Sequence, residues 1–228
     1  MTDDEAISPR QFLESAGVED WRTIWGGGWA CACFRTASFA AGLALLQRIG
    51  ALDGVAAHPP DVDLRPDTVT VRLFTGTMGG LSRRDAELAR LISITARETG
   101  AQPAPELVQH VQIAVDAASP QTVRPFWRAV LGYQEVGDED LFDPLRRGPS
   151  CWFQQMAEPR PQRNRIHIDL YLPHDQVRTR IDAALAAGGR VVSDARAPHW
   201  WTLADPEGNE VDLAIWMMGP DGLDTVTG

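Results

Sequence analysis

The sequence has no excess of basic residues. Its 228 residues include 21 Lys and Arg against 31 Asp and Glu, which gives a formal net charge of -10. A surface that follows the phosphates of a nucleic acid needs more Lys and Arg than Asp and Glu. Nucleic acid is therefore excluded as the expected partner.

Long apolar runs and a secretory leader pattern are also missing. No apolar stretch approaches the roughly 18 residues that cross a bilayer. The first residues, MTDDEAISPRQF, are acidic, whereas a secretory signal is basic and then apolar. We therefore expect a cytoplasmic protein without a membrane partner. Hydrophobic residues make up 44% of the chain and no Ser- or Gln-rich tract occurs, so a folded globular protein is predicted.

Cysteine is scarce, and the three that occur form no CxxC pair. Cys31 and Cys33 alternate within an apolar run, so they are expected on the same face of a strand, and Cys151 stands alone. This pattern favours reduced core cysteines over a metal or redox site.

Prolines and glycines mark one break in the chain, at TGAQPAPE, residues 99–106. The break ends a helical stretch and precedes an alternating apolar segment. It divides the chain into domains at 1–100 and 107–217, each large enough for its own core.

The sequence of the first piece predicts an α+β fold with the element order α-β-β-α-β-β-α and with its helices on one face of the sheet. Ser82 is the expected N-cap of its last helix, with Asp85 at the capping-box position. The predicted elements are a helix at 9–16, a hairpin within 20–36 that turns at Gly26–Gly28, a helix at 38–49, strands at 62–64 and 68–74, and a helix from 83.

The second piece contains one pattern twice, βαβββ followed by βαβββ, and each half opens on a histidine-led strand. Such an internal repeat predicts two pseudo-symmetric modules. The first half has a strand at 110–115, a helix at 119–131 and strands at 133–136, 141–142 and 151–156. The polar link 157–165 leads to a strand at 167–172, a helix at 176–187 and strands at 191–192, 200–203 and 210–216.

The segment HPPDVDLRPDTVTVRLFTGTMGGLSRRDAELA, residues 58–89, resembles the core of the pterin-4a-carbinolamine dehydratase family, and a weaker resemblance extends over residues 8–98. That family carries His-His-Pro, then a Thr-His pair, then Gly-Leu-Ser/Thr-x-x-Asp. Its histidines act as acid and base when water is removed from a 4a-hydroxytetrahydropterin. The resemblance implies a catalytic role for His58, a pocket role for Asp85 and a pterin as substrate.

Two of the three histidine positions of this pattern are changed. Pro59 stands at the second position and Gly76 at the third, after Thr75. Neither side chain can transfer a proton, and positioned acid and base groups typically contribute about 10²–10⁴-fold each. We therefore expect the dehydratase fold with weak or absent standard activity.

The segments HVQIAVD, RPFWRAVLGY, RIHIDLYL and WTLADPEGNEVDLAIW resemble the vicinal oxygen chelate superfamily, in its glyoxalase-like branch, over residues 107–217. Members fold as paired βαβββ modules that form a cup, and many hold one divalent metal there. The resemblance implies His110, His167 and Asp212 as metal ligands. Fe(II), Mn(II), Ni(II), Co(II) or Zn(II) would suit such a set.

Strand alternation supports a shared polar face. His110 and Gln112 alternate with apolar residues, as do His167, Asp169 and Tyr171, and so does Asp212. Gln154 or Gln155 could be a fourth ligand or a substrate contact, and Asp169, Tyr171 and Trp200 are further candidates for substrate binding.

The preferred hypothesis is a small-molecule enzyme, a lyase or isomerase that acts through a metal-binding cup. The alternatives are an active 4a-hydroxytetrahydropterin dehydratase that uses His58, a metal-free binding or resistance protein, and a scaffold whose first domain dimerises the chain. Both resemblances imply that the chain could form a homo-oligomer.

Overall fold

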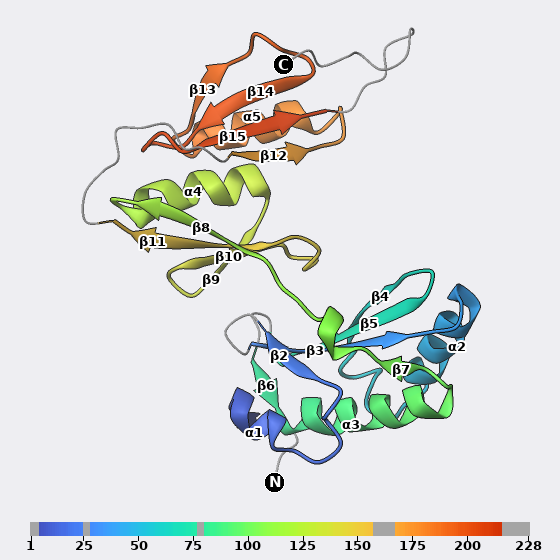
Figure 1. Ribbon diagram of the computed structural model, residues 1–228. Coiled ribbons are helices and arrows are strands. Elements are labelled where there is room, and N and C mark those ends of the chain that lie inside the picture. The colour runs from blue at the N-terminus through green and yellow to red at the C-terminus, as the bar shows by residue number, and fades with distance from the viewer. Residues whose placement is uncertain (1–4, 25–27, 77–79, 157–166, 216–228) are drawn as a thin grey trace, which may run out of the picture. The chain divides into compact units, whose positions relative to one another are not determined.

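The computed structural model describes residues 5–24, 28–76, 80–156 and 167–215. Some predicted features lie outside these ranges: most of the glycine turn (Gly26 and Gly27), Gly79, the polar link 157–165 and Trp216. The chain divides into two compact units, Met1–His110 and Val111–Gly228, each shown in Figure 1. No helix within the described ranges has both the length and the hydrophobicity that a membrane crossing requires.

The first unit is an antiparallel sheet covered by helices. Its strands run in the order β2-β3-β5-β4, with β7 added beside β3. The elements are β1 (Ala6–Ile7), α1 (Pro9–Leu13), β2 (Arg22–Ile24), β3 (Trp29–Arg35), α2 (Phe39–Gly50), β4 (Asp61–Leu64), β5 (Thr68–Leu73), β6 (Leu81–Ser82), α3 (Arg83–Glu98), β7 (Gln102–Pro103) and the 3-10 helix η1 (Pro105–Leu107).

Alternation along β3 and β5 separates the two faces of this sheet. Ala30, Ala32 and Phe34 are fully buried and pack in one core with residues of α2 and α3, including Leu45 and Ile92. Both helices therefore cover the same face, which confirms the predicted α+β layering.

The cysteines are free and buried, as predicted for core residues. Cys31 and Cys33 lie on the face of β3 that points away from the main core. Burial raises the pKa of Cys31 to about 11, and burial likewise raises the pKa of Cys151 to about 12. Both thiols therefore remain protonated near neutral pH.

The second unit contains the predicted repeat. Its two sheets have the orders β8-β11-β10-β9 and β12-β15-β14-β13, so the first and last strands of each βαβββ module lie side by side and parallel. The first module has β8 (Gln112–Ala117), α4 (Pro120–Leu131), β9 (Gln134–Val136), β10 (Asp140–Phe142) and β11 (Ser150–Gln155). The second has β12 (Ile168–Tyr171), α5 (Val177–Ala186), β13 (Arg190–Ser193), β14 (Trp200–Ala204) and β15 (Glu210–Ala214).

One hydrophobic core joins the two modules. Phe126 and Trp127 of α4 and Ile181 of α5 belong to the same buried cluster as residues of β11 and β15. The Trp127 indole N–H donates to the Asp205 carboxylate at 2.9 Å, which satisfies the polar end of a buried ring. The apolar face of each sheet is thus used for the core, and the opposite face carries the polar side chains.

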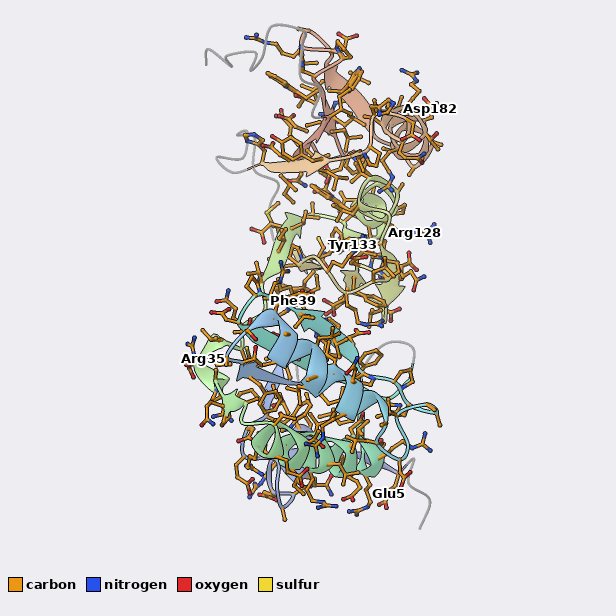
Figure 2. All side chains as sticks on the ribbon, turned by 90° about the vertical axis from the view of Figure 1, so that its right-hand side faces the viewer. Glu5, Arg35, Phe39, Arg128, Tyr133 and Asp182 are labelled. Atoms are coloured by element: carbon orange, nitrogen blue, oxygen red, sulfur yellow. The ribbon has the colours of Figure 1, made fainter. Side chains whose placement is uncertain are left out.

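The segment that precedes the second unit is attached to the first. Pro103 pairs with Phe34 of β3, the Ala104 N–H donates to the Cys33 carbonyl at 2.8 Å, and Arg35, labelled in Figure 2, forms an ion pair with Glu106. Further along, the His110 ring packs edge-on against Trp29, with ring centres 5.3 Å apart. Residues 102–110 are therefore part of the structure of the first unit.

A first unit that ends at Gly100 is expected to unfold more easily than one that ends at His110. The shorter piece loses the pairing of β7 with β3 and the contact of His110 with Trp29. A backbone hydrogen bond and an aromatic pair each contribute on the order of 1 kcal/mol, so a loss of about 2–3 kcal/mol is expected in urea unfolding. Equal unfolding free energies for the two pieces would contradict this assignment.

Candidate functional site

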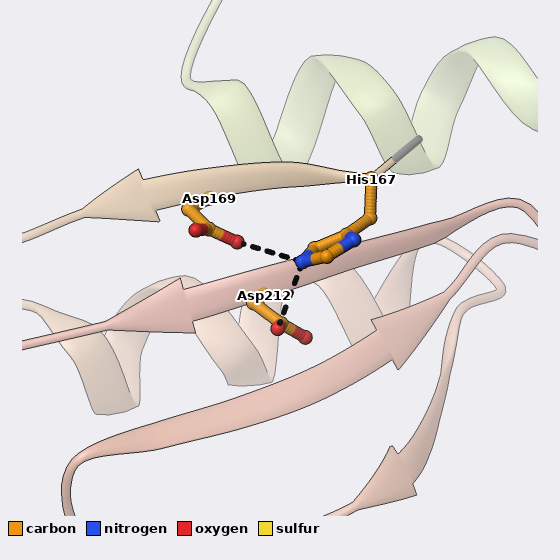
Figure 3. Close-up of side chains that lie close together, drawn as sticks. All are labelled: His167, Asp169 and Asp212. Atoms are coloured by element: carbon orange, nitrogen blue, oxygen red, sulfur yellow. Dashed lines mark ion pairs between the residues drawn. The ribbon is translucent and has the colours of Figure 1, made fainter. Parts of the chain in front are cut away.

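Three potential metal ligands gather on the polar face of the second sheet. The parallel register pairs Asp169 of β12 with Asp212 of β15, and His167 stands two residues before Asp169 on the same face. The His167 Nε2 atom lies 3.3 Å from Asp169 Oδ1 and 3.7 Å from Asp212 Oδ2, as Figure 3 shows. Each of the three residues offers one ligand atom, and these three atoms all lie within 4.8 Å of one another.

This cluster is accessible from solvent. The His167 and Asp169 side chains are each 48% exposed, and that of Asp212 is 18% exposed. One imidazole nitrogen and two carboxylate oxygens form a donor set that suits divalent transition metals and leaves positions open for substrate. The residues present therefore fit the metal ion that the sequence predicts, although Asp169 joins the group that was expected to contain His110.

The glutamines of β11 point to opposite faces. The parallel register pairs Gln154 with Asp116 and Gln155 with Ala117. Because Ala117 is fully buried, alternation puts Gln154 on the polar face and Gln155 on the core side, where its amide donates to the Ala118 carbonyl at 3.4 Å. Gln154 is accordingly the better candidate for a contact with substrate or metal.

His110 lies just before the first strand of the second unit. The sequence predicted a strand from residue 110, but pairing begins at Gln112, and the His110 ring packs on Trp29 in the first unit. Burial, and then the nearby charge of Arg72, lower the pKa of His110. The role of His110 as a metal ligand stays a prediction.

In the first unit, His58 and Asp85 are in direct contact. The His58 Nε2 atom lies 2.7 Å from Asp85 Oδ1, and the two side chains are 15% and 0% exposed. The second oxygen, Oδ2, accepts from the Ser82 backbone N–H at 2.7 Å and from the Thr75 hydroxyl at 2.6 Å. A buried carboxylate that is fixed in this way orients the imidazole, as positioned acid and base groups require.

The capping box of α3 explains how Asp85 is held. Ser82 caps the helix and accepts from the Asp85 backbone N–H, while the Asp85 carboxylate accepts from the Ser82 N–H. This confirms the predicted helix start with Asp in place of the usual Glu or Gln. The same carboxylate thus both starts the helix and contacts His58.

The substituted histidine positions have their own backbone geometry. Gly76 has a φ of 82°, a left-handed conformation that favours glycine. A side chain at this position would be strained in the present conformation, so the backbone here favours glycine over the histidine of the dehydratase pattern.

Sequence reasoning missed two features of these sites. Thr75 was considered only as the neighbour of the missing histidine, whereas its hydroxyl binds the Asp85 carboxylate. Asp169 was expected to contact substrate, and its contact with the His167 ring was not foreseen. Strand alternation already placed His167 and Asp169 on one polar face, and the parallel pairing of Asp169 with Asp212 is what adds Asp169 to the candidate ligands.

Both parts of the chain match known families. Residues 3–94 match the family model described as pterin 4 alpha carbinolamine dehydratase, and residues 112–214 match that described as glyoxalase-like domain. The chain therefore joins a pterin-4a-carbinolamine dehydratase-like domain to a glyoxalase-like domain, as the sequence predicted. Domains of these kinds indicate a small-molecule enzyme or binding protein.

The curated relatives resemble the first domain. A putative pterin-4-alpha-carbinolamine dehydratase of Nocardia farcinica is 47% identical over 60 residues, which are 26% of this chain and 63% of that protein. Another of that description, from Chloroflexus aggregans, is 39% identical over 59 residues, again 26% of this chain and 63% of the relative. This chain thus covers less than two thirds of the length of either relative.

Solved structures resemble each domain at low identity. A glyoxalase-related enzyme from Fulvimarina pelagi is 20% identical, with a TM-score of 0.37, over 51% of this chain and 96% of that one. A transcriptional coactivator/pterin dehydratase from Brucella melitensis is 19% identical, with a TM-score of 0.34, over 38% of this chain and 90% of that one.

Asp85→Ala is expected to destabilise the first unit strongly. The change removes the capping-box acceptor, leaves the buried Ser82 backbone N–H without its acceptor and removes one of the two hydrogen-bond partners of the Thr75 hydroxyl, which keeps Ser82 Oγ at 2.7 Å. Each buried unsatisfied group costs about 1–3 kcal/mol, so a loss of roughly 3 kcal/mol is expected in urea unfolding. Asp63→Ala, at an exposed carboxylate of the same unit, is the control and should change the free energy by less than about 1 kcal/mol. Similar losses in the two variants would refute the role given to Asp85.

Proposed function

We propose that this chain is a small-molecule enzyme, a lyase or isomerase, that acts through its glyoxalase-like unit. In this proposal His167, Asp169 and Asp212 hold a divalent metal ion on the polar face of the second sheet. The observation that carries the proposal is the convergence of their ligand atoms, all within 4.8 Å of one another. When bound, such an ion polarises a carbonyl or enediolate oxygen of the substrate.

The exposed carboxylate of Asp169 supplies a proton acceptor in this arrangement. Asp169 is more exposed than Asp212, and its Oδ1 atom lies 3.3 Å from His167 Nε2. Removal of a proton beside a polarised oxygen is the step that lyases and isomerases of this chemistry share, and a positioned carboxylate can accept it. Asp169 would hold the ion with His167 and Asp212 through one carboxylate oxygen and would accept the proton on the other.

Gln154 is the candidate contact with substrate or metal in the first module. Its position on the polar face of β11 leaves its amide available to a substrate oxygen or to the metal. A metal-free binding protein is the alternative, in which the same polar face would hold a ligand without changing it.

Metal content tests this proposal. Untagged chain, reconstituted anaerobically with Fe(II), Mn(II), Ni(II), Co(II) or Zn(II), should retain about one ion per chain by plasma mass spectrometry with at least one of these metals. His167→Ala and Asp212→Ala should each lose it, because each removes a ligand of the cluster.

His174→Ala is the matched control, since His174 is an exposed histidine of the same unit. It should retain the ion. His110→Ala decides whether that histidine contributes: retention would mean that the cluster of the second sheet suffices. If the wild-type chain retains no metal, the metalloenzyme hypothesis is wrong and the metal-free binding protein is the remaining alternative.

A second function, residual dehydration of a 4a-hydroxytetrahydropterin, is favoured by the 2.7 Å contact between His58 and Asp85. A histidine oriented by a buried carboxylate can serve as acid or base at the leaving hydroxyl. With one proton carrier in place of three, turnover should be slow.

His58→Ala is expected to abolish this turnover, whereas His167→Ala should leave it unchanged. Stopped-flow absorbance of the 4a-hydroxytetrahydropterin, compared with its spontaneous dehydration, would measure the rates. One positioned acid or base typically contributes about 10²–10⁴-fold, so a rate at least about tenfold above the spontaneous one is a modest requirement. A smaller excess in the wild-type chain would rule out dehydratase activity of the first unit.

A further inference from the structure

The two ring nitrogens of His58 have different surroundings. The Nε2 atom lies 2.7 Å from Asp85 Oδ1, whereas no hydrogen bond from the described residues reaches Nδ1. An ionised carboxylate only accepts hydrogen bonds, so Nε2 donates its proton to Asp85 and Nδ1 carries the lone pair of the neutral ring. The side chain is 15% exposed, so Nδ1 is the ring nitrogen that a ligand can contact.

The backbone of His58 is fixed by the turn that follows α2. Its N–H donates to the Gly54 carbonyl at 2.9 Å. The contact with Asp85 then decides how the ring is turned about its side-chain bonds. A ring turned the other way would leave a buried carboxylate oxygen without its donor, which is costly.

Three donors hold the other oxygen of Asp85. The Oδ2 atom accepts from the Ser82 N–H at 2.7 Å, from the Ser82 hydroxyl at 2.9 Å and from the Thr75 hydroxyl at 2.6 Å. Ser82 is the N-cap of α3, so its donors belong to the start of that helix. Thr75 instead follows β5, where its own N–H donates to the Gly80 carbonyl at 2.9 Å. Thr75 therefore ties the carboxylate to a second part of the fold.

We infer that Nδ1 of His58 is the atom that exchanges a proton with a ligand, and that Thr75 is the positioning residue behind it. Thr75 acts through Asp85, because its hydroxyl fixes Oδ2 and thereby the direction in which Oδ1 meets Nε2. The inference deepens the second function proposed above, and it rests on that function for the identity of the ligand. The choice between the two ring nitrogens does not depend on the reaction.

Thr75→Val should disturb the His58–Asp85 pair and spare the helix. A methyl group would replace the hydroxyl that lies 2.6 Å from Oδ2, and carbon needs about 3.5 Å to its neighbours. The carboxylate must then move away, so its contact with Nε2 becomes longer or less well aligned and weakens. The bond from the Asp85 backbone N–H to the Ser82 hydroxyl does not involve Thr75, so α3 should keep its start.

NMR of the ring nitrogens tests the choice of Nδ1 in the wild-type chain. Long-range ¹H–¹⁵N spectra of the full chain, labelled with ¹⁵N-histidine, report which nitrogen of each neutral ring carries the proton, and His58→Gln identifies the His58 signals. His58 should hold its proton on Nε2 more completely than the exposed His174 does. Its two ¹⁵N shifts should therefore be further apart than those of His174. A proton on Nδ1, or a separation no larger than that of His174, would overturn this assignment.

Variants test the role of Thr75 by the same measurement. In Thr75→Val the separation of the His58 shifts should fall to that of His174, whereas Thr75→Ser keeps the hydroxyl and should retain the wild-type separation. Thr70→Val is the matched control, because it removes a hydroxyl of β5 that contacts Cys33 instead of the carboxylate.

The backbone signals of α3 show whether each variant is folded. If Thr75→Val unfolds, Thr75→Ala takes its place, since it removes the hydroxyl and adds no methyl group beside the carboxylate. A wild-type separation in a folded chain that lacks the Thr75 hydroxyl would overturn the positioning role. An equal loss in Thr70→Val would overturn it as well.

Kinetics separates this inference from the proposed reaction. If the wild-type chain dehydrates the pterin, Thr75→Val should lower kcat by about tenfold with little change in KM, and Thr75→Ser should restore it. A change in KM alone would assign Thr75 to substrate binding and overturn the positioning role. If the wild-type chain shows no turnover, the proposed dehydration is wrong, while the spectra still decide which ring nitrogen is available and what holds it.

Discussion

The parallel pairing of the first and last strands of each βαβββ module is the constraint on which the second unit depends. In the second module this pairing aligns Asp169 with Asp212 and sets His167 beside them. The equivalent pairing in the first module aligns Gln154 with Asp116. Every second residue of these strands packs into the hydrophobic core that α4 and α5 share. The polar residues between them therefore lie on the opposite face of the sheet.

The two units hold their candidate chemistry in different ways. In the first, Asp85 is fully buried and is bound by Ser82, Thr75 and His58, so the position of the imidazole is tied to the start of α3. In the second, His167 and Asp169 lie on an open face. A locked dyad suits proton transfer to one fixed atom, whereas an open cluster suits a metal ion and a substrate that completes its coordination.

The sequence predicted most elements because alternation and helical spacing are local signals. It failed where structure depends on pairing between distant residues. Gln102 and Pro103 read as a linker, since a two-residue strand has no periodicity, yet they pair with β3. The choice between Gln154 and Gln155 required the register with β8, and the contact of His58 with Asp85 joins residues 27 positions apart. The gathering of His167 and Asp169 on one face was accessible from their spacing alone.

We propose that His167, Asp169 and Asp212, at β12 and β15, hold a divalent metal ion. The most direct measurement is an NMR titration of the ¹⁵N-labelled, EDTA-treated chain with substoichiometric Mn²⁺, because a bound paramagnetic ion broadens the amide signals near it. An ion bound at this cluster should broaden the amide signals of Asp169, Asp212 and their strand neighbours, while the signals of α3 in the first unit stay sharp. Broadening that is absent there, or that spreads evenly over the acidic surface, would contradict it.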